Sequence, residues 1–260
     1  MRRRALLAIA FLAGLHGFAS AAAAPQGPET AAACGPVTEE GSTYTVCTID
    51  LDRYDIGLFW KGADGLPYGS FSRLASSPAG RNLVMAMNAG MYDVDLSPVG
   101  LYVEGGRELK RANTAGGHGN FHLKPNGVFY VAGDQAGVIE TGRYLRARPR
   151  PAVATQSGPM LVIDGRLHPK FSDEGPSRKL RNGVGVRDGK TVVFAISDSP
   201  VSFGSFARLF RDRLGCRNAL FLDGSVSSLY APSLGRSDFG RPMGPILGAT
   251  PKAASTQAPR

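Results

Sequence analysis

The sequence predicts an α+β fold: mixed, strand-rich sheets with few helices in a single compact domain. Glycine accounts for 34 of the 260 residues, close to twice its usual share, which favours many tight turns over long helices. Short runs of strand-forming residues are separated by glycine, proline or charged turns, and only one segment has helical spacing. No internal repeat or linker divides the chain, so we expect one domain.

Nine apolar runs of strand length are expected to form the sheets. They are residues 44–49, 56–60, 83–87, 99–103, 128–132, 160–163, 184–186, 192–196 and 219–222. The predicted helix shows apolar residues at helical spacing before a terminating glycine: Phe203, Phe206, Phe210, Leu214 and Gly215. Ser202 is expected to be its N-cap.

This helix lies between two of the predicted strands, 192–196 and 220–222. Such an order is typical of a βαβ-type crossover, which brings the loops after both strands to the same edge of a sheet. We therefore expect Asp198 and Asp223 at one edge.

The N-terminus is typical of a secretory signal peptide. Three arginines precede an apolar run over residues 5–18 and small residues up to Ala24, so we expect cleavage near residues 22–24 and a periplasmic or secreted protein. A twin-arginine signal remains an alternative, whereas Cys34 lies too far from the apolar run for a lipoprotein signal. No segment is long enough to span a membrane. The domain is predicted over 25–232, followed by a partly disordered tail over 233–260 that is rich in glycine, proline, serine and alanine.

The net charge points to an anionic partner. Residues 1–24 contain three arginines and no acid, so their removal lowers the formal charge from +9 to +6. A positive surface attracts phosphate or acidic polymers, but the basic residues are not interleaved with aromatic ones, so nucleic acid is not expected.

Three cysteines allow one disulfide in an oxidising compartment. Cys34 and Cys47 are close in sequence and would leave Cys216 as a small core residue, while pairing of Cys47 with Cys216 remains open.

Asp223 is the first candidate for catalysis. It ends the strand 219–222 and precedes Gly224, Ser225 and Ser227, so a rigid strand can hold the carboxylate while the glycine admits a ligand to the backbone. Asn88 similarly follows a strand and precedes Gly90, where its amide can bind a sugar hydroxyl or a phosphate oxygen, or merely cap a turn.

Two further segments contain candidates for anion binding. Ser157 and Gly158 lie in a polar turn before a strand, where successive N–H groups can hold an anion, and Arg181 precedes a glycine-flanked strand and can clamp a phosphate. An ordinary loop and a surface ion pair are the respective alternatives. His118, between glycines, can touch a ligand, but the glycines around His118 and His122 forbid a helical zinc pair, so no metal and no cofactor are expected.

Four segments together resemble the phosphodiester glycosidase family. They are Asn88-Ala89-Gly90-Met91-Tyr92, Gly158-Pro159-Met160-Leu161-Val162, Arg181 with Val184-Gly185, and Leu222-Asp223-Gly224-Ser225-Val226-Ser227. Their order and spacing are similar to the family pattern over residues 80–232, most closely in a bacterial periplasmic branch. Ala89 and Ser225-Val226 replace family glycines, so the loop around the acid is less permissive and the substrate can differ.

The resemblance implies an exported hydrolase that cleaves the glycosidic C–O bond of a sugar-1-phosphodiester in cell-envelope or extracellular polysaccharide. A phosphate leaves as a stable anion, so one carboxylate with cationic and amide donors can suffice. Asp223 is then the base or the nucleophile, Arg181 holds the phosphate together with N–H groups near Gly158 and Gly90, Asn88 binds substrate, and Asp198 is a second carboxylate.

Two other function classes compete with this expectation. A non-catalytic carbohydrate- or sugar-phosphate-binding protein would use Asp223 only as a hydrogen-bond acceptor. A metal-dependent phosphodiesterase would need acids and histidines at metal-binding spacing, which the sequence does not show.

Overall fold

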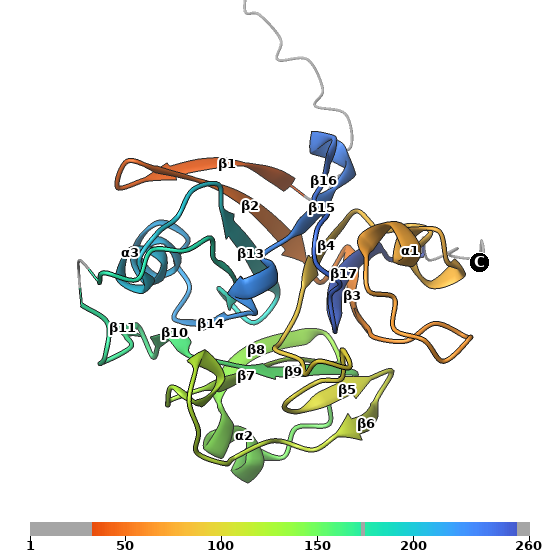
Figure 1. The fold of residues 1–260 in the computed structure, drawn as a ribbon, viewed down its shortest axis with the longest axis horizontal. Coiled ribbons are helices and arrows are strands. Elements are labelled where there is room, and N and C mark those ends of the chain that lie inside the picture. Colours follow the sequence, from red (N-terminus) through yellow and green to blue (C-terminus); the bar gives the residue numbers. More distant parts are fainter. Residues whose placement is uncertain (1–32, 173–174, 254–260) are drawn as a thin grey trace, which may run out of the picture. The chain divides into compact units, whose positions relative to one another are not determined.

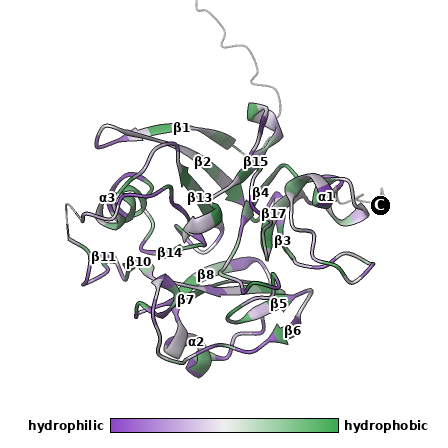
Figure 2. Ribbon diagram, in the orientation of Figure 1, coloured by the Kyte–Doolittle hydropathy of each residue, from purple (hydrophilic) through white to green (hydrophobic). Residues whose placement is uncertain are grey.

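Three antiparallel sheets surround one central core in the computed structural model, which describes residues 33–172 and 175–253 (Figure 1). Apolar residues from all three sheets meet in this core, among them Phe194, Met87 and Phe129. Figure 2 shows hydrophobic stretches mainly along the strands. The predicted α+β, strand-rich architecture in one compact unit is confirmed, and the expected signal peptide, 1–24, lies outside the described residues.

The first sheet has seven strands in the spatial order β1-β2-β13-β12-β14-β10-β11. Their bounds are β1 Ala33–Glu39, β2 Ser42–Asp50, β10 Met160–Ile163, β11 Arg166–Leu167, β12 Asn182–Val186, β13 Thr191–Ser197 and β14 Asn218–Phe221. Because β12 pairs antiparallel with both β13 and β14, these two strands run in the same direction. The loops that follow them therefore leave the sheet at the same edge, as the crossover predicted.

The other two sheets have five strands each. The second sheet, in the order β16-β15-β4-β17-β3, consists of β3 Tyr54–Phe59, β4 Met85–Asn88, β15 Leu229–Ala231, β16 Arg236–Ser237 and β17 Ile246–Pro251. The third sheet, in the order β6-β5-β9-β7-β8, consists of β5 Tyr102–Glu104, β6 Arg107–Lys110, β7 Gly127–Ala132, β8 Gln135–Glu140 and β9 Val153–Ser157.

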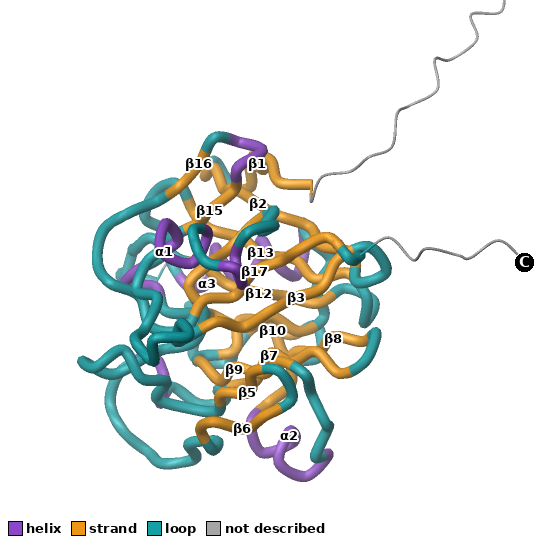
Figure 3. The backbone as a smooth tube through the Cα atoms, turned by 90° about the vertical axis from the view of Figure 1, so that its right-hand side faces the viewer, coloured by secondary structure: helices purple, strands orange, loops and turns teal. Residues whose placement is uncertain are grey.

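Each sheet packs a short helix against the face that is turned away from the central core (Figures 1 and 3). The helices are α1 Phe71–Ala75, α2 Thr141–Ala147 and α3 Phe203–Arg208. Short 3-10 turns cover Pro78–Gly80, Asn120–His122, Gly224–Val226 and Pro232–Leu234. The Ser202 side chain caps α3 by accepting a hydrogen bond from the Ser205 N–H, as expected.

The predicted helix over 203–214 is α-helical only in its first half. A π-helical turn, Leu209–Arg213, follows α3 and is closed by the N–H of Leu214, which donates to the carbonyl of Leu209 at 2.9 Å. Phe206 and Phe210 are fully buried against the first sheet, and Gly215 ends the segment in a left-handed conformation with φ of +67°. The apolar stripe is thus core, as its spacing indicated.

The expected domain end at residue 232 needs correction. β17 lies between β3 and β4 in the second sheet and pairs with both, and Ile246 and Leu247 are fully buried. Glycine serves close packing here rather than flexibility, because a Cβ on Gly248 would lie 2.5 Å from the Leu83 side chain. Residues 254–260 lie outside the described part of the chain.

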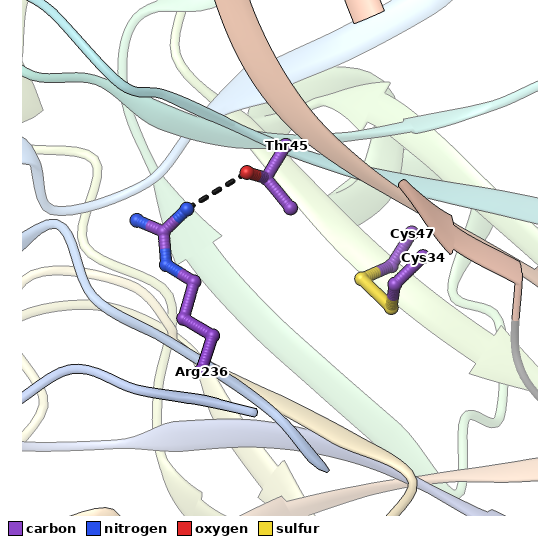
Figure 4. The surroundings of a disulfide bond; sticks show 4 residues. All are labelled: Cys34, Thr45, Cys47 and Arg236. Atoms are coloured by element: carbon purple, nitrogen blue, oxygen red, sulfur yellow. Dashed lines mark hydrogen bonds between the residues drawn. A yellow bond between two sulfur atoms is a disulfide. The ribbon is translucent and has the colours of Figure 1, made fainter. Parts of the chain in front are cut away.

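Cys34 and Cys47 form a disulfide that links β1 to β2 (Figure 4). Cys216 is a free, buried cysteine, as expected for the pairing of Cys34 with Cys47. Thr45, two residues before Cys47 on β2, accepts a hydrogen bond from Arg236 at 2.8 Å. The disulfide-bonded strand β2 therefore also holds the start of β16.

Candidate active site

Asp223 is a buried carboxylate just beyond the end of β14. Its backbone N–H donates to the carbonyl of Ala89 at 3.1 Å, and its Oδ1 accepts the N–H of Ser225 at 3.0 Å. Only 8% of the residue is exposed. Burial raises the pKa of this carboxyl group above its ordinary value, against the opposing effect of the Ser225 hydrogen bonds. The carboxylate is therefore rigidly held and more basic than an aspartate in water.

Asn88 holds the Asp223 loop through two hydrogen bonds. Its Nδ2 donates to the backbone carbonyl of Asp223 at 2.8 Å, and its Oδ1 accepts the N–H of Ser228 at 2.9 Å. The residue is 1% exposed, so the amide binds protein rather than a ligand in this structure. Of the two roles that the sequence left open, the structure assigns Asn88 to holding the turn.

Asn182 helps to position the Asp223 loop, a role that the sequence did not reveal. Its Nδ2 donates to Oδ1 of Asn88 at 2.9 Å, and its Oδ1 accepts the hydroxyl of Ser227 at 3.1 Å. These bonds tie β12, β4 and the Asp223–Ser228 loop together around two buried amides, those of Asn88 and Asn182. An asparagine within an otherwise apolar strand was the available signal, because a buried amide needs partners.

Arg181 is a buried cation. It is 1% exposed, yet its Nε donates to the carbonyl of Val201 at 2.9 Å and its Nη2 to the carbonyl of Ser177 at 2.8 Å. Within residues 33–172 and 175–253, no acidic side chain forms an ion pair with it. Burial lowers its pKa to about 10, so the guanidinium stays charged at neutral pH. A buried cation without a counter-ion is costly, which makes it a candidate for binding an anionic ligand.

Aromatic rings support this guanidinium. Its carbon lies 3.5 Å from the centroid of the Phe203 ring and 5.6 Å from that of Phe221. Phe203 stacks in turn on Phe171, with centroids 5.0 Å apart, and Phe171 stacks on His168 at 4.6 Å. The stack fixes the plane of the guanidinium and replaces part of its lost hydration.

A Phe203→Leu substitution tests this support. We expect the affinity for inorganic phosphate to fall roughly 3- to 30-fold, because the cation–π contact of a desolvated guanidinium is lost while volume is largely kept. Isothermal titration calorimetry measures the effect. Phe71→Leu is the control: it changes a buried ring of α1 that packs beside Tyr230 of β15, and it should leave phosphate affinity unchanged. Equal phosphate binding by both variants would contradict the assignment.

A cavity of about 480 Å³ opens over Arg181. Its lining is rich in cations and polar backbone: Asn120, Ser177, Lys179, Leu180, Arg181, Phe221, Gly224, Ser225 and Arg241. Three of these residues are basic and none is acidic, so the cavity favours an anion. Gly224 and Ser225 directly follow Asp223, so the backbone at Asp223 lies next to this cavity, hereafter the cationic cavity, although its lining does not include Asp223.

Tyr92 links the surroundings of Asp223 to the loop that contains Arg241. Burial, together with the negative charge of Asp223, raises the pKa of Tyr92 to about 12, although the positive charge of Arg241 opposes the shift. Its hydroxyl donates to the carbonyl of Pro242 at 2.7 Å. The first family-like segment and the loop around Arg241 therefore meet beside the carboxylate.

Gly90, Ser157 and Gly158 are buried, do not line the cationic cavity, and differ from the expected anion-binding turns. The Gly90 N–H donates to the hydroxyl of Thr155 at 3.3 Å, and a Cβ at Gly90 would lie 2.4 Å from the Gln156 carbonyl oxygen. Close packing of β9 against this turn, not ligand approach, requires the glycine. Gly158 is similarly packed against Asn126, and Ser157 is fully buried with no partner for its hydroxyl among the described residues.

Asp198 and His118 do not line the cationic cavity. Asp198 pairs with Arg236 at 2.9 Å and lines a neighbouring cavity together with Ser227. His118 is exposed in the loop before the Asn120–His122 turn. Within the described residues, no group of three or more His, Cys, Asp or Glu side chains could hold a metal ion.

Comparisons with known proteins identify the family of the chain. Residues 81–249 match the phosphodiester glycosidase family. The chain is 35% identical over 189 residues to the uncharacterized protein YigE of Escherichia coli, covering 72% of this chain and 74% of that protein.

Solved structures show the same fold at low sequence identity. One is the catalytic domain of zebrafish N-acetylglucosamine-1-phosphodiester alpha-N-acetylglucosaminidase, auto-inhibited by its pro-peptide, with a TM-score of 0.57 and 13% identity over 83% of this chain and 80% of that one. Another, from Burkholderia pseudomallei, is described as a protein proposed to be exported, with a TM-score of 0.51 and 14% identity over 81% and 74% of the two chains.

Proposed function

The chain belongs to the phosphodiester glycosidase family, and from this premise we propose that it is an exported hydrolase of sugar-1-phosphodiesters in cell-envelope or extracellular polysaccharide. The observation that carries the proposal is Arg181, a buried cation with no carboxylate partner among the described residues, which faces a cavity next to Asp223. A phosphodiester supplies the missing anion. Its sugar then places the anomeric carbon toward the acid.

The reaction breaks the bond between the anomeric carbon and the phosphate oxygen. The bonding electrons leave with the phosphate, whose negative charge Arg181, Lys179 and Arg241 stabilise, so the leaving group needs little protonation. Asp223 acts either as a base that accepts a proton from the attacking water or as the nucleophile on the anomeric carbon. In both courses the oxygen of water ends on the sugar. The raised pKa of Asp223 makes it a better base than an aspartate in water.

Export rests on the N-terminal sequence and on the disulfide. Residues 1–24 have the pattern of a signal peptide, and the Cys34–Cys47 disulfide is typical of an oxidising compartment. In the described part of the chain, no helix is long and apolar enough to cross a membrane.

Oxygen labelling tests the proposed reaction. The purified protein is incubated in ¹⁸O-water with UDP-N-acetylglucosamine and with the methyl phosphodiester of N-acetylglucosamine 1-phosphate. We expect the label in the released sugar, because the C–O bond breaks. Label in the phosphate would show P–O cleavage and refute the proposal. Binding of the phosphodiester without release of sugar would favour a non-catalytic binding protein. The low exposure of Asp223 is compatible with that alternative.

A further inference from the structure

A second cavity, of about 370 Å³, adjoins the cationic cavity. Its lining is Leu180, Ile196, Ser197, Asp198, Ser227, Ser228, Arg236, Ser237, Asp238 and Phe239. Leu180 lines both cavities, so it forms the ridge between them. The loop after Asp223 contributes Ser225 to the first cavity and Ser227 to the second. Both hollows therefore belong to one groove along this loop.

The two halves of the groove differ in charge. Arg181 in the first cavity has no carboxylate partner among the described residues, whereas Arg236 in the second is neutralised by Asp198 and Asp238 at 2.9 and 3.0 Å. Nη1 of Arg236 also donates a hydrogen bond to the hydroxyl of Thr45. Arg236 is the basic residue in the lining of the second cavity, and because it is already paired it is not available to bind an anion. The second cavity presents carboxylate oxygens and serine hydroxyls, which suit uncharged hydroxyl groups.

Phe239 stands at the rim of the second cavity with its ring in solvent. The residue is 98% exposed, and Leu180 on the ridge is 43% exposed. Both residues line a cavity that is otherwise mostly polar, and such a mixed lining suits a ligand with an apolar face and hydroxyl groups. The flat face of a phenyl ring matches the C–H face of a pyranose, whose hydroxyl groups then point to its edges.

We propose that this second cavity is a subsite for a neutral sugar ring of the substrate, stacked on Phe239 and hydrogen-bonded by Asp198 and the serines. This inference rests on the proposed function, because it makes the substrate a glycan with an uncharged sugar beside the phosphodiester. The loop over residues 238–241 serves both halves, since Phe239 lines the sugar subsite and Arg241 the cationic cavity.

Binding experiments test the subsite without relying on hydrolysis. Neutral trisaccharides of glucose, galactose, mannose or N-acetylglucosamine, and inorganic phosphate, are titrated into the wild-type protein and into Phe239→Ala. We expect at least one trisaccharide to bind, and its affinity to fall about tenfold in Phe239→Ala, equivalent to one aromatic contact. Phosphate affinity should be unchanged. Val94→Ala is the matched control, because Val94 is 99% exposed and lines neither half of the groove.

The outcomes separate this inference from the proposed function. If no trisaccharide binds, or if Phe239→Ala binds it as tightly as the wild type, the subsite is refuted, while the ¹⁸O experiment still decides on hydrolysis. If the trisaccharide binds through Phe239 but no phosphodiester is cleaved, the subsite stands and the hydrolase proposal fails. A similar loss of affinity in Val94→Ala would also refute the role of Phe239.

Discussion

Asp223→Asn is expected to lower kcat for glycosyl phosphodiester hydrolysis on the order of 10³-fold, because asparagine can neither accept a proton nor attack the anomeric carbon. The substitution preserves size, and the amide oxygen can still accept the Ser225 N–H. Phosphate affinity should remain within a factor of about three, because the guanidinium of Arg181 is untouched. Steady-state kinetics and phosphate titration measure the two effects separately.

The Asp223→Asn substitution should raise the free energy of unfolding at pH 7, although it lowers kcat. Burial raises the pKa of Asp223 in the folded protein, so the folded state binds more protons than the unfolded state between the two pKa values, and ionisation lowers the free energy of unfolding as pH rises. At pH 7, Asp223→Asn should therefore be more stable than the wild type, and the difference should vanish at a pH below the ordinary aspartate pKa. Denaturant unfolding at both pH values measures this difference.

The exposed Asp212 supplies a control for Asp223. Its pKa is lowered by its hydrogen bond to Arg211, so Asp212→Asn should not stabilise the protein at pH 7 and should leave hydrolysis unchanged. Full activity of Asp223→Asn would remove the carboxylate from the mechanism.

The sequence predicted the architecture because the dominant signals were local. Glycine content and short apolar runs indicated strands, and the phenylalanine spacing indicated the helix that covers the first sheet. The nine predicted runs missed eight of the described strands, β9 and β17 among them. Thr155, Gln156 and Gly248 resemble loop residues in sequence, whereas in the structure they are buried and are hydrogen-bonded or closely packed by distant segments. Such partners cannot be inferred from a local window.

The site was predictable in part for the same reason. Asp223 and Arg181 stand out at strand ends, and the structure brings the Asp223 loop and Arg181 to one cavity. The pairing of Asp198 with Arg236, the occupied N–H of Gly90 and the bridging amide of Asn182 depend on contacts between residues that are 38, 65 and 94 positions apart. Long-range contacts of this kind decide whether a polar group is free to bind a ligand.

Arg181→Met is expected to reduce kcat/KM on the order of 10²- to 10³-fold, because a buried donor that stabilises the departing phosphate is lost. Phosphate binding should fall in parallel. Methionine keeps much of the apolar stem against Phe203 and Phe221, so the packing of the stack is largely retained. Arg217→Met, at an exposed arginine outside both halves of the groove, is the control and should behave as the wild type.

Arg181→Met should not lower the stability of the protein. This result would distinguish a ligand-binding arginine from a structural one. The wild-type protein buries this charge without a counter-ion among the described residues, a cost that methionine removes. The two carbonyls that Arg181 bonds keep other partners: Val201 still accepts the N–H of Lys179 at 3.1 Å, and Ser177 is exposed to water. We therefore expect a Tm at or above that of the wild type. A lower Tm with unchanged kcat/KM would show that Arg181 supports the fold, and that the anion of the substrate binds elsewhere.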